Sequence, residues 1–123
     1  MTEGAANKGD AFPQIDAATA GEWLESGTAM LIDVRETHEF EYENVPGSFL
    51  LPLSFLDPEL FPAIADMRIV VMCAIGKRSA AAQKQLVQFG RANVYNLEGG
   101  LDAWKKEGLE TQGGKFESMD YSI

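Results

Sequence analysis

Apolar residues gather in short runs along the chain, and glycine, proline and acidic residues separate these runs. Two of the runs, residues 29–34 and 68–73, are almost continuously apolar, which is typical of strands buried on both faces. Three shorter runs have strand composition and end at turn residues. The pattern therefore predicts strands over residues 12–15, 29–34, 48–51, 68–73 and 93–97.

Helical spacing and capping residues occupy the segments between these runs. Asp16 is placed to cap a helix that carries Trp23 on its apolar face. Asp57 followed by Pro58 has the composition of another helix start, and Gly90 that of a helix end. Helices are predicted over residues 17–26, 36–43, 57–65, 79–89 and 101–107.

Strands and helices therefore alternate along most of the chain. This order predicts an α/β domain with a mostly parallel central sheet of about five strands, flanked by helices on both faces. A length of 123 residues fits one domain. We expect the domain to span residues 11–110. Residues 1–10 and 111–123 show little periodicity and are predicted to be tails.

Charge and composition narrow the possible partners. The net charge of −9 argues against nucleic acid, because neutralising phosphates requires clustered lysine and arginine. No apolar run approaches the roughly 20 residues of a membrane span, and the first residues are polar, without the apolar core of a secretory signal. We therefore expect no membrane contact and a cytoplasmic location.

The chain has one cysteine and one histidine, too few for an intrachain disulfide or a typical structural zinc site. Gly99-Gly100 lacks the spacing of a dinucleotide-binding fingerprint and predicts only a tight turn between strand and helix. We expect neither a metal nor a cofactor.

The lone thiol, Cys73, stands at the predicted end of a buried strand, with a glycine-containing loop and a helix after it. The carboxyl ends of parallel strands are where open α/β sheets bind ligands, and a helix N-terminus favours negative charge. Two neighbouring cations, Lys77 and Arg78, should also lower the pKa of the thiol, and the thiolate is the nucleophile. Cys73 is therefore the candidate catalytic residue, although many unpaired cysteines are simply small buried residues.

The loop after the cysteine is the candidate binding site for an anion. Gly76 allows it to curl so that successive backbone amides point inward, and such a nest could hold a thiolate or a persulfide anion. The predicted substrate-binding residues are Ala74, Ile75, Gly76, Lys77, Arg78 and Ser79.

Four segments of the chain resemble the rhodanese family. Residues 73–79, Cys-Ala-Ile-Gly-Lys-Arg-Ser, match its active-site pattern Cys-x-x-Gly-x-Arg-Ser/Thr at every fixed position. Residues 31–35 with Glu39-Phe40, residues 45–52 and residues 96–104 are similar to its other motifs, in the same order. One difference is Glu43-Asn44, where the family often has Gly-His. We expect Asn44 to supply a comparable hydrogen bond to a turn backbone.

The resemblance implies a rhodanese-like domain and a sulfurtransferase activity. In that reaction Cys73 would take a sulfur atom from a small anionic donor such as thiosulfate, become a persulfide, and pass the sulfur to cyanide, a small thiol or a protein thiol. Phosphatases and arsenate reductases of this fold have a loop one residue longer, whereas here four residues separate Cys73 from Arg78. An alternative is a sulfur-carrier or partner-binding module with little turnover of its own.

Other polar residues are assigned structural roles. Asp33 and Arg35 follow a buried strand, and Arg35 is expected to pair with Glu39 and brace the loop side of the sheet. His38 and the glutamates around it are interpreted as an exposed helix face. Apolar residues of the third predicted strand and of the segment after it are expected to be mostly core, with some forming a rim around Cys73; they are Phe49, Leu50, Leu51, Phe55, Leu56 and Phe61.

Overall fold

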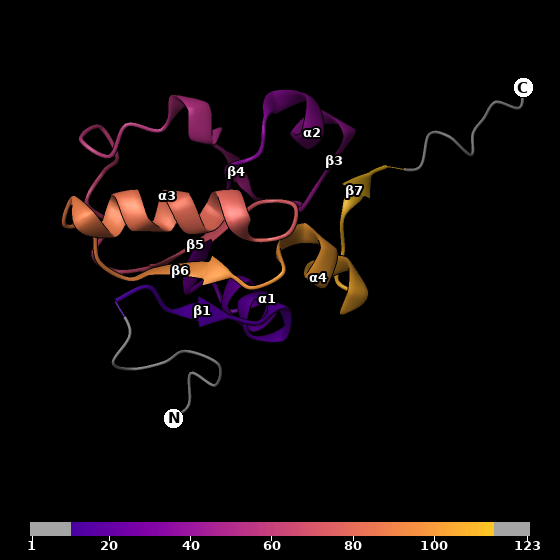
Figure 1. The fold of residues 1–123 in the computed structure, drawn as a ribbon. Helices are drawn as coiled ribbons and strands as arrows, with labels where there is room; N and C mark the ends of the chain where they lie inside the picture. Colours follow the sequence, from indigo (N-terminus) through magenta and orange to yellow (C-terminus); the bar gives the residue numbers. More distant parts are fainter. Residues whose placement is uncertain (1–10, 115–123) are drawn as a thin grey trace, which may run out of the picture.

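The computed structural model describes residues 11–114 and shows a parallel five-stranded sheet with helices on both of its faces (Figure 1). The strand order is β1-β6-β5-β2-β4, and every neighbouring pair is parallel. The five strands are β1 (Gln14–Ile15), β2 (Ala29–Asp33), β4 (Phe49–Leu50), β5 (Arg68–Met72) and β6 (Val94–Leu97). The predicted fold class is confirmed.

Four helices connect the strands, namely α1 (Ala17–Glu25), α2 (Thr37–Tyr42), α3 (Lys77–Gln88) and α4 (Gly100–Lys106). Asp16 caps α1 as predicted, since its carboxylate accepts a hydrogen bond of 2.8 Å from the amide of Thr19. A short 3₁₀ helix, η1 (Leu53–Phe55), follows β4. Helix α3 begins two residues earlier than expected, so Lys77 and Arg78 lie in its first turn.

Strand β5 lies at the centre of the sheet and is buried on both faces. Because side chains alternate along a strand, Val70 and Met72 belong to the core under α1 and α4, while Ile69, Val71 and Cys73 belong to the core under α3. The alternation therefore directs the only thiol toward the α3 face.

The helix predicted over residues 57–65 is wrong. Asp57 does accept a hydrogen bond of 3.0 Å from the amide of Glu59, but the chain makes only a turn before it straightens. Pro62 would clash within a continuing helix and disfavours a helical conformation at Phe61. The guanidinium of Arg91 donates hydrogen bonds to the carbonyls of Pro58 and Phe61, at 3.2 and 2.9 Å.

A second, two-stranded antiparallel sheet was not expected. It joins β3 (Glu43–Asn44) to β7 (Gln112–Gly113). The described structure therefore continues beyond residue 110, where the C-terminal tail was predicted to begin. The rest of that predicted tail, residues 115–123, and the N-terminal tail, residues 1–10, lie outside the described residues.

The segment after β4 is less buried than its apolar sequence indicated. Phe61 is in the core and Leu50, Leu51 and Leu56 are half-buried, but Phe49 and Phe55 are exposed. Strand β4 is at the edge of the sheet, so Phe49 lacks a neighbouring strand on one side. Within residues 11–114, no helix has both the length and the apolar character needed to cross a membrane.

Candidate active site

Cys73 directly follows β5, and the loop after it leads into α3. The side chain is buried, with the residue only 1% exposed. The N-terminus of α4 fixes the start of the loop, because the amide of Leu101 donates to the carbonyl of Cys73 at 2.8 Å and that of Asp102 to the carbonyl of Ala74 at 3.1 Å. The backbone at the start of the loop is thus anchored to both β5 and α4.

Three donor groups lie within hydrogen-bond distance of the Cys73 sulfur. They are the amide of Gly76 at 3.1 Å, the amide of Ser79 at 3.3 Å and the hydroxyl of Ser79 at 3.3 Å. Gly76 is the N-cap residue of α3 and has no side chain to satisfy the first amides of the helix, so the sulfur does this instead. A sulfur in this position faces the positive end of the helix dipole.

These contacts decide the ionisation of the thiol. Burial by itself raises the pKa of Cys73, but hydrogen bonds from the Ser79 hydroxyl and from the amides of Ser79, Gly76 and Ile75 lower it. The pKa of Cys73 lies below its ordinary value as a result. The site therefore favours the nucleophilic thiolate.

Two glycines make this geometry possible. Gly76 has a φ of 104°, a left-handed conformation that lets the loop curl back over the sulfur. Gly100 has a φ of 61°, and a Cβ atom there would collide with the carbonyl of Cys73 and the backbone of Ala74. The Gly99-Gly100 turn was predicted, but its close approach to the active-site loop was not.

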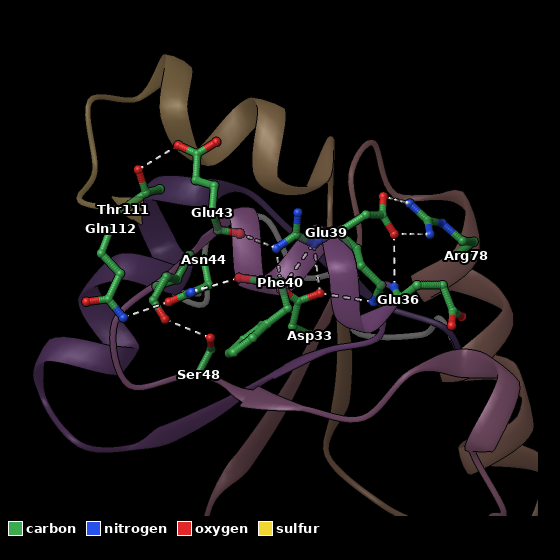
Figure 2. A network of polar contacts seen from close by, with 12 residues as sticks. Asp33, Glu36, Glu39, Phe40, Glu43, Asn44, Ser48, Arg78, Thr111 and Gln112 are labelled. Carbon is green, nitrogen blue, oxygen red and sulfur yellow. Dashed lines mark hydrogen bonds and ion pairs between the residues drawn. The ribbon is translucent and has the colours of Figure 1, made fainter. Parts of the chain in front are cut away.

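Arg78 forms a bidentate ion pair with Glu39 of α2, with distances of 2.8 and 3.0 Å (Figure 2). The pKa of Glu39 is lowered to about 2: the hydrogen bond from Arg78 contributes most, burial opposes it, and the amide of Glu36 and the charges of Arg78 and Arg35 add to the lowering. In return, Glu39 raises the pKa of Arg78. The predicted pair between Arg35 and Glu39 is therefore wrong, since Glu39 is bound to the loop instead.

Arg35 pairs with Asp33, two residues before it. Its Nη2 lies 2.8 Å from a carboxylate oxygen of Asp33 and 2.7 Å from the carbonyl of Glu43. Both side chains are buried, so the pair joins the end of β2 to the segment after α2. The structural role expected of Asp33, Arg35 and Glu39 fits these contacts, with the partners exchanged.

The model of the family described as the rhodanese-like domain matches residues 16–107. The chain belongs to the rhodanese-like domain family. A relative among curated proteins, slr1261 of Synechocystis sp., is 42% identical over 82 residues, which are 67% of this chain and 46% of that protein. The chain thus matches less than half the length of that relative.

Two solved structures illustrate the similarity. A rhodanese-related protein from Thermoplasma volcanium is 33% identical, with a TM-score of 0.71 over 80% of this chain and 96% of its own. The protein RPA3614 of Rhodopseudomonas palustris, described as a possible tyrosine phosphatase, is 28% identical, with a TM-score of 0.74 over 83% of this chain and 86% of its own.

The remaining loop residues of this rhodanese-like domain lie at its surface or contribute backbone. Ile75 and Lys77 are exposed, and Ala74 is half-buried. Within residues 11–114, Lys77 forms no ion pair, whereas the charge of Arg78 is taken by Glu39. Lys77 is therefore the loop cation that remains available to a bound anion.

Two polar residues, Asn96 and Glu43, make contacts that were not predicted from the sequence. Asn96, at 1% exposure, accepts a hydrogen bond of 2.6 Å from the Ser79 hydroxyl and donates to the carbonyl of Gly76 at 3.2 Å. In the sequence, Asn96 was recognised only as part of the motif in residues 96–104, without a role of its own. Glu43 was taken for part of an exposed face, but it is buried and accepts hydrogen bonds from Lys105 and Thr111, both at 2.8 Å. The contact with Thr111 is drawn in Figure 2.

The predictions for two other residues, His38 and Asn44, agree with the structure. His38 is exposed on α2, as expected. Asn44 donates to the carbonyl of Phe40 at 2.8 Å, which is the kind of backbone hydrogen bond predicted for it, and it accepts one of 2.7 Å from Gln112.

Across the described part of the chain, no group of three or more histidine, cysteine, aspartate or glutamate side chains is placed to hold a metal ion.

Proposed function

We propose that this rhodanese-like domain is a sulfurtransferase in which Cys73 carries a sulfur atom as a persulfide. The observation that carries the proposal is the set of three donor groups, from Gly76 and Ser79, that converge on the Cys73 sulfur. Such donors stabilise a thiolate, and the same curled loop would stabilise negative charge on one further sulfur atom. The family to which the chain belongs supports the same reaction class.

The proposed reaction has two steps. The Cys73 thiolate attacks the outer sulfur of thiosulfate, an S–S bond forms to Cys73, and the original S–S bond breaks as sulfite leaves with its electron pair. An acceptor such as cyanide or a thiolate then attacks the outer sulfur of the persulfide, and the Cys73 thiolate is released. Neither step requires a general base while the thiol is ionised.

The burial of Cys73 limits what can react with it. Because the residue is only 1% exposed, the reacting atom must be narrow, as the terminal sulfur of thiosulfate or a cyanide carbon is. Lys77 is exposed beside the loop and would attract an anionic donor. We therefore propose a small anionic sulfur donor and a small acceptor, or a protein thiol presented on a slender segment.

Phosphoryl transfer is the competing reaction, because RPA3614 is described as a possible tyrosine phosphatase. Two features of this chain favour sulfur transfer. Only four residues separate Cys73 from Arg78, which makes a small loop. The Arg78 guanidinium is also occupied on two of its nitrogens by Glu39, so it is not free to bind the oxygens of a phosphate.

The proposal is tested by steady-state turnover of thiosulfate and cyanide, measured for the chain and for its Cys73→Ser variant. Turnover that disappears in the variant is the expected result. Persulfide formation without turnover would instead favour the alternative, a sulfur carrier that depends on a partner protein. Hydrolysis of a phenyl phosphate ester with no reaction toward thiosulfate would contradict the proposal.

Cys73 must return to the free thiolate in every cycle, which requires that it not be trapped in mixed disulfides. A reducing compartment such as the cytoplasm meets that requirement. We therefore include a cytoplasmic location in the proposal.

A further inference from the structure

The Ser79 hydroxyl lies between two acceptors. Its oxygen is 3.3 Å from the Cys73 sulfur and 2.6 Å from Oδ1 of Asn96. All three residues are buried, with exposures of 0% for Ser79 and 1% for each of the other two. A serine hydroxyl carries a single proton, so it can donate to only one of the two acceptors at a time.

The orientation of the Asn96 amide is fixed by its other contacts. Its Nδ2 donates to the carbonyl of Gly76 at 3.2 Å and to Oε1 of Gln14 at 3.4 Å, and the carbonyl oxygen of Gly76 can only accept, so it could not pair with Oδ1. Oδ1 must therefore face Ser79. Two oxygens 2.6 Å apart require a proton between them, and the amide oxygen has none to give, so Ser79 supplies it.

The charge on Cys73 determines whether the Ser79 hydroxyl donates its hydrogen bond to Cys73 or to Asn96. A neutral thiol is a weak acceptor, and the hydroxyl then donates to Asn96. A thiolate is a charged acceptor and binds a hydroxyl more strongly, but Oδ1 of Asn96 would then lie buried without a hydrogen bond. We propose that the Ser79 hydroxyl is a one-proton switch between Asn96 and Cys73, and that Asn96 is a positioning residue that opposes formation of the thiolate through this switch.

The consequence for the reaction rests on the proposed function. In the persulfide the inner sulfur is bonded twice and uncharged, so the hydroxyl returns to Asn96. When the acceptor attacks the outer sulfur, the S–S bond breaks and its electron pair goes to the Cys73 sulfur. The hydroxyl then turns to that sulfur without losing its proton. Its hydrogen bond is thus strongest where charge develops on the leaving group.

Other charged groups surround the sulfur, and they are common to all the variants compared below. Lys77 and Arg78 are in the first turn of α3, where Arg78 is paired with Glu39 of α2, while Asp33 and Arg35 form their own pair at the end of the neighbouring strand β2. Asp102 is exposed at the start of α4. A difference in ionisation between the variants therefore reports on Ser79 and Asn96.

The test uses the rate at which iodoacetamide alkylates Cys73 as a function of pH. Cys73 is the only cysteine, so the midpoint of the profile is its pKa. Asn96→Leu keeps the shape of the side chain but removes the acceptor, and we expect it to lower this pKa by about one unit. Ser79→Ala should raise the pKa, because the thiolate loses a donor.

The double variant separates a switch from a general structural effect. If Asn96 acts through the hydroxyl, Asn96→Leu has no effect on the pKa of Cys73 once Ser79 is alanine. An equal shift with and without the hydroxyl would overturn the proposal, as would no shift in either background. Asn96→Ala provides a second variant, and thermal unfolding establishes that each protein is folded.

A measurement on the unmodified chain keeps the proposal testable if these variants do not fold. The carbon-13 shift of the Asn96 side-chain carbonyl should titrate with the same midpoint as Cys73 and should be independent of pH in Cys73→Ser. A shift that does not follow the thiol would contradict the switch. Neither measurement involves sulfur transfer, so failure of the proposed function would be seen separately, as absence of the persulfide.

Discussion

The ion pair between Glu39 and Arg78 ties the active-site loop to α2, and its contribution to stability can be predicted. Glu39→Gln removes the negative charge but keeps an oxygen that can accept the amide of Glu36, 2.9 Å away. The substitution therefore tests the charge on Glu39 with little change in shape.

The expected magnitude follows from the pKa of Glu39, which falls from 4.5 to about 2. At about 1.4 kcal/mol for each pKa unit, this difference corresponds to about 3 kcal/mol. The side chains of Arg78 and Glu39 are 38% and 26% exposed, so solvent screening reduces the value. We expect Glu39→Gln to lower the free energy of unfolding by about 1–2 kcal/mol at pH 7.

The stabilisation by Glu39 depends on pH, and the lowered pKa of Glu39 determines the direction of this dependence. Because folding lowers the pKa of Glu39, the stabilisation is complete above pH 4.5 and is lost as the pH falls toward about 2. Urea unfolding should therefore give a difference in the free energy of unfolding between the chain and Glu39→Gln that decreases as the pH falls from 4.5 to about 2. The matched control is Glu41→Gln, an exposed glutamate on the same helix. Equal losses of stability in both variants at pH 7, or a difference between the chain and Glu39→Gln that is unchanged at about pH 2, would show that the Glu39 charge does not stabilise the fold in this way.

Three further predictions concern single side chains. Gly100→Ala should lower the free energy of unfolding by more than about 3 kcal/mol, because its Cβ would collide with the loop backbone. Gly108→Ala, also at positive φ but in open space, should lower it by about 1 kcal/mol. Urea unfolding measures both variants, and equal losses would contradict the collision at Gly100. Lys77→Gln should raise the thiosulfate concentration for half-maximal persulfide formation about 2–10-fold at low salt and much less at high salt, with Lys84→Gln, exposed farther along α3, as an inert control. Asp33→Asn leaves a buried guanidinium without its charged partner and should cost about 3–5 kcal/mol by chemical denaturation; a loss below about 1 kcal/mol would argue against that pair.

The sequence was most informative where one local pattern determines the structure. The apolar run before Cys73 predicts a buried strand, and the glycine and cations after it predict a loop at a helix start. Both predictions are confirmed by β5 and α3. The hydrogen bonds on the sulfur follow from this local geometry, since they come from residues only three and six positions further along the chain.

Contacts between distant segments could not be predicted in the same way. Glu39 and Arg78 are 39 residues apart, and their pairing depends on how α2 packs beside the loop. Ser79 and Asn96 meet because β5 and β6 are neighbours in the sheet. The helix predicted over residues 57–65 failed for a local reason, since Pro62 was present in the sequence and opposes helix continuation.

The proposed persulfide on Cys73 is tested most directly by intact-protein mass spectrometry after incubation with thiosulfate under non-reducing conditions. We expect a gain of about 32 Da, the mass of one sulfur atom, localised to Cys73 and absent from Cys73→Ser. The gain should disappear when cyanide is added. A chain that stays unmodified, while iodoacetamide shows the Cys73 thiol to be reduced and reactive at the same pH, would contradict the account.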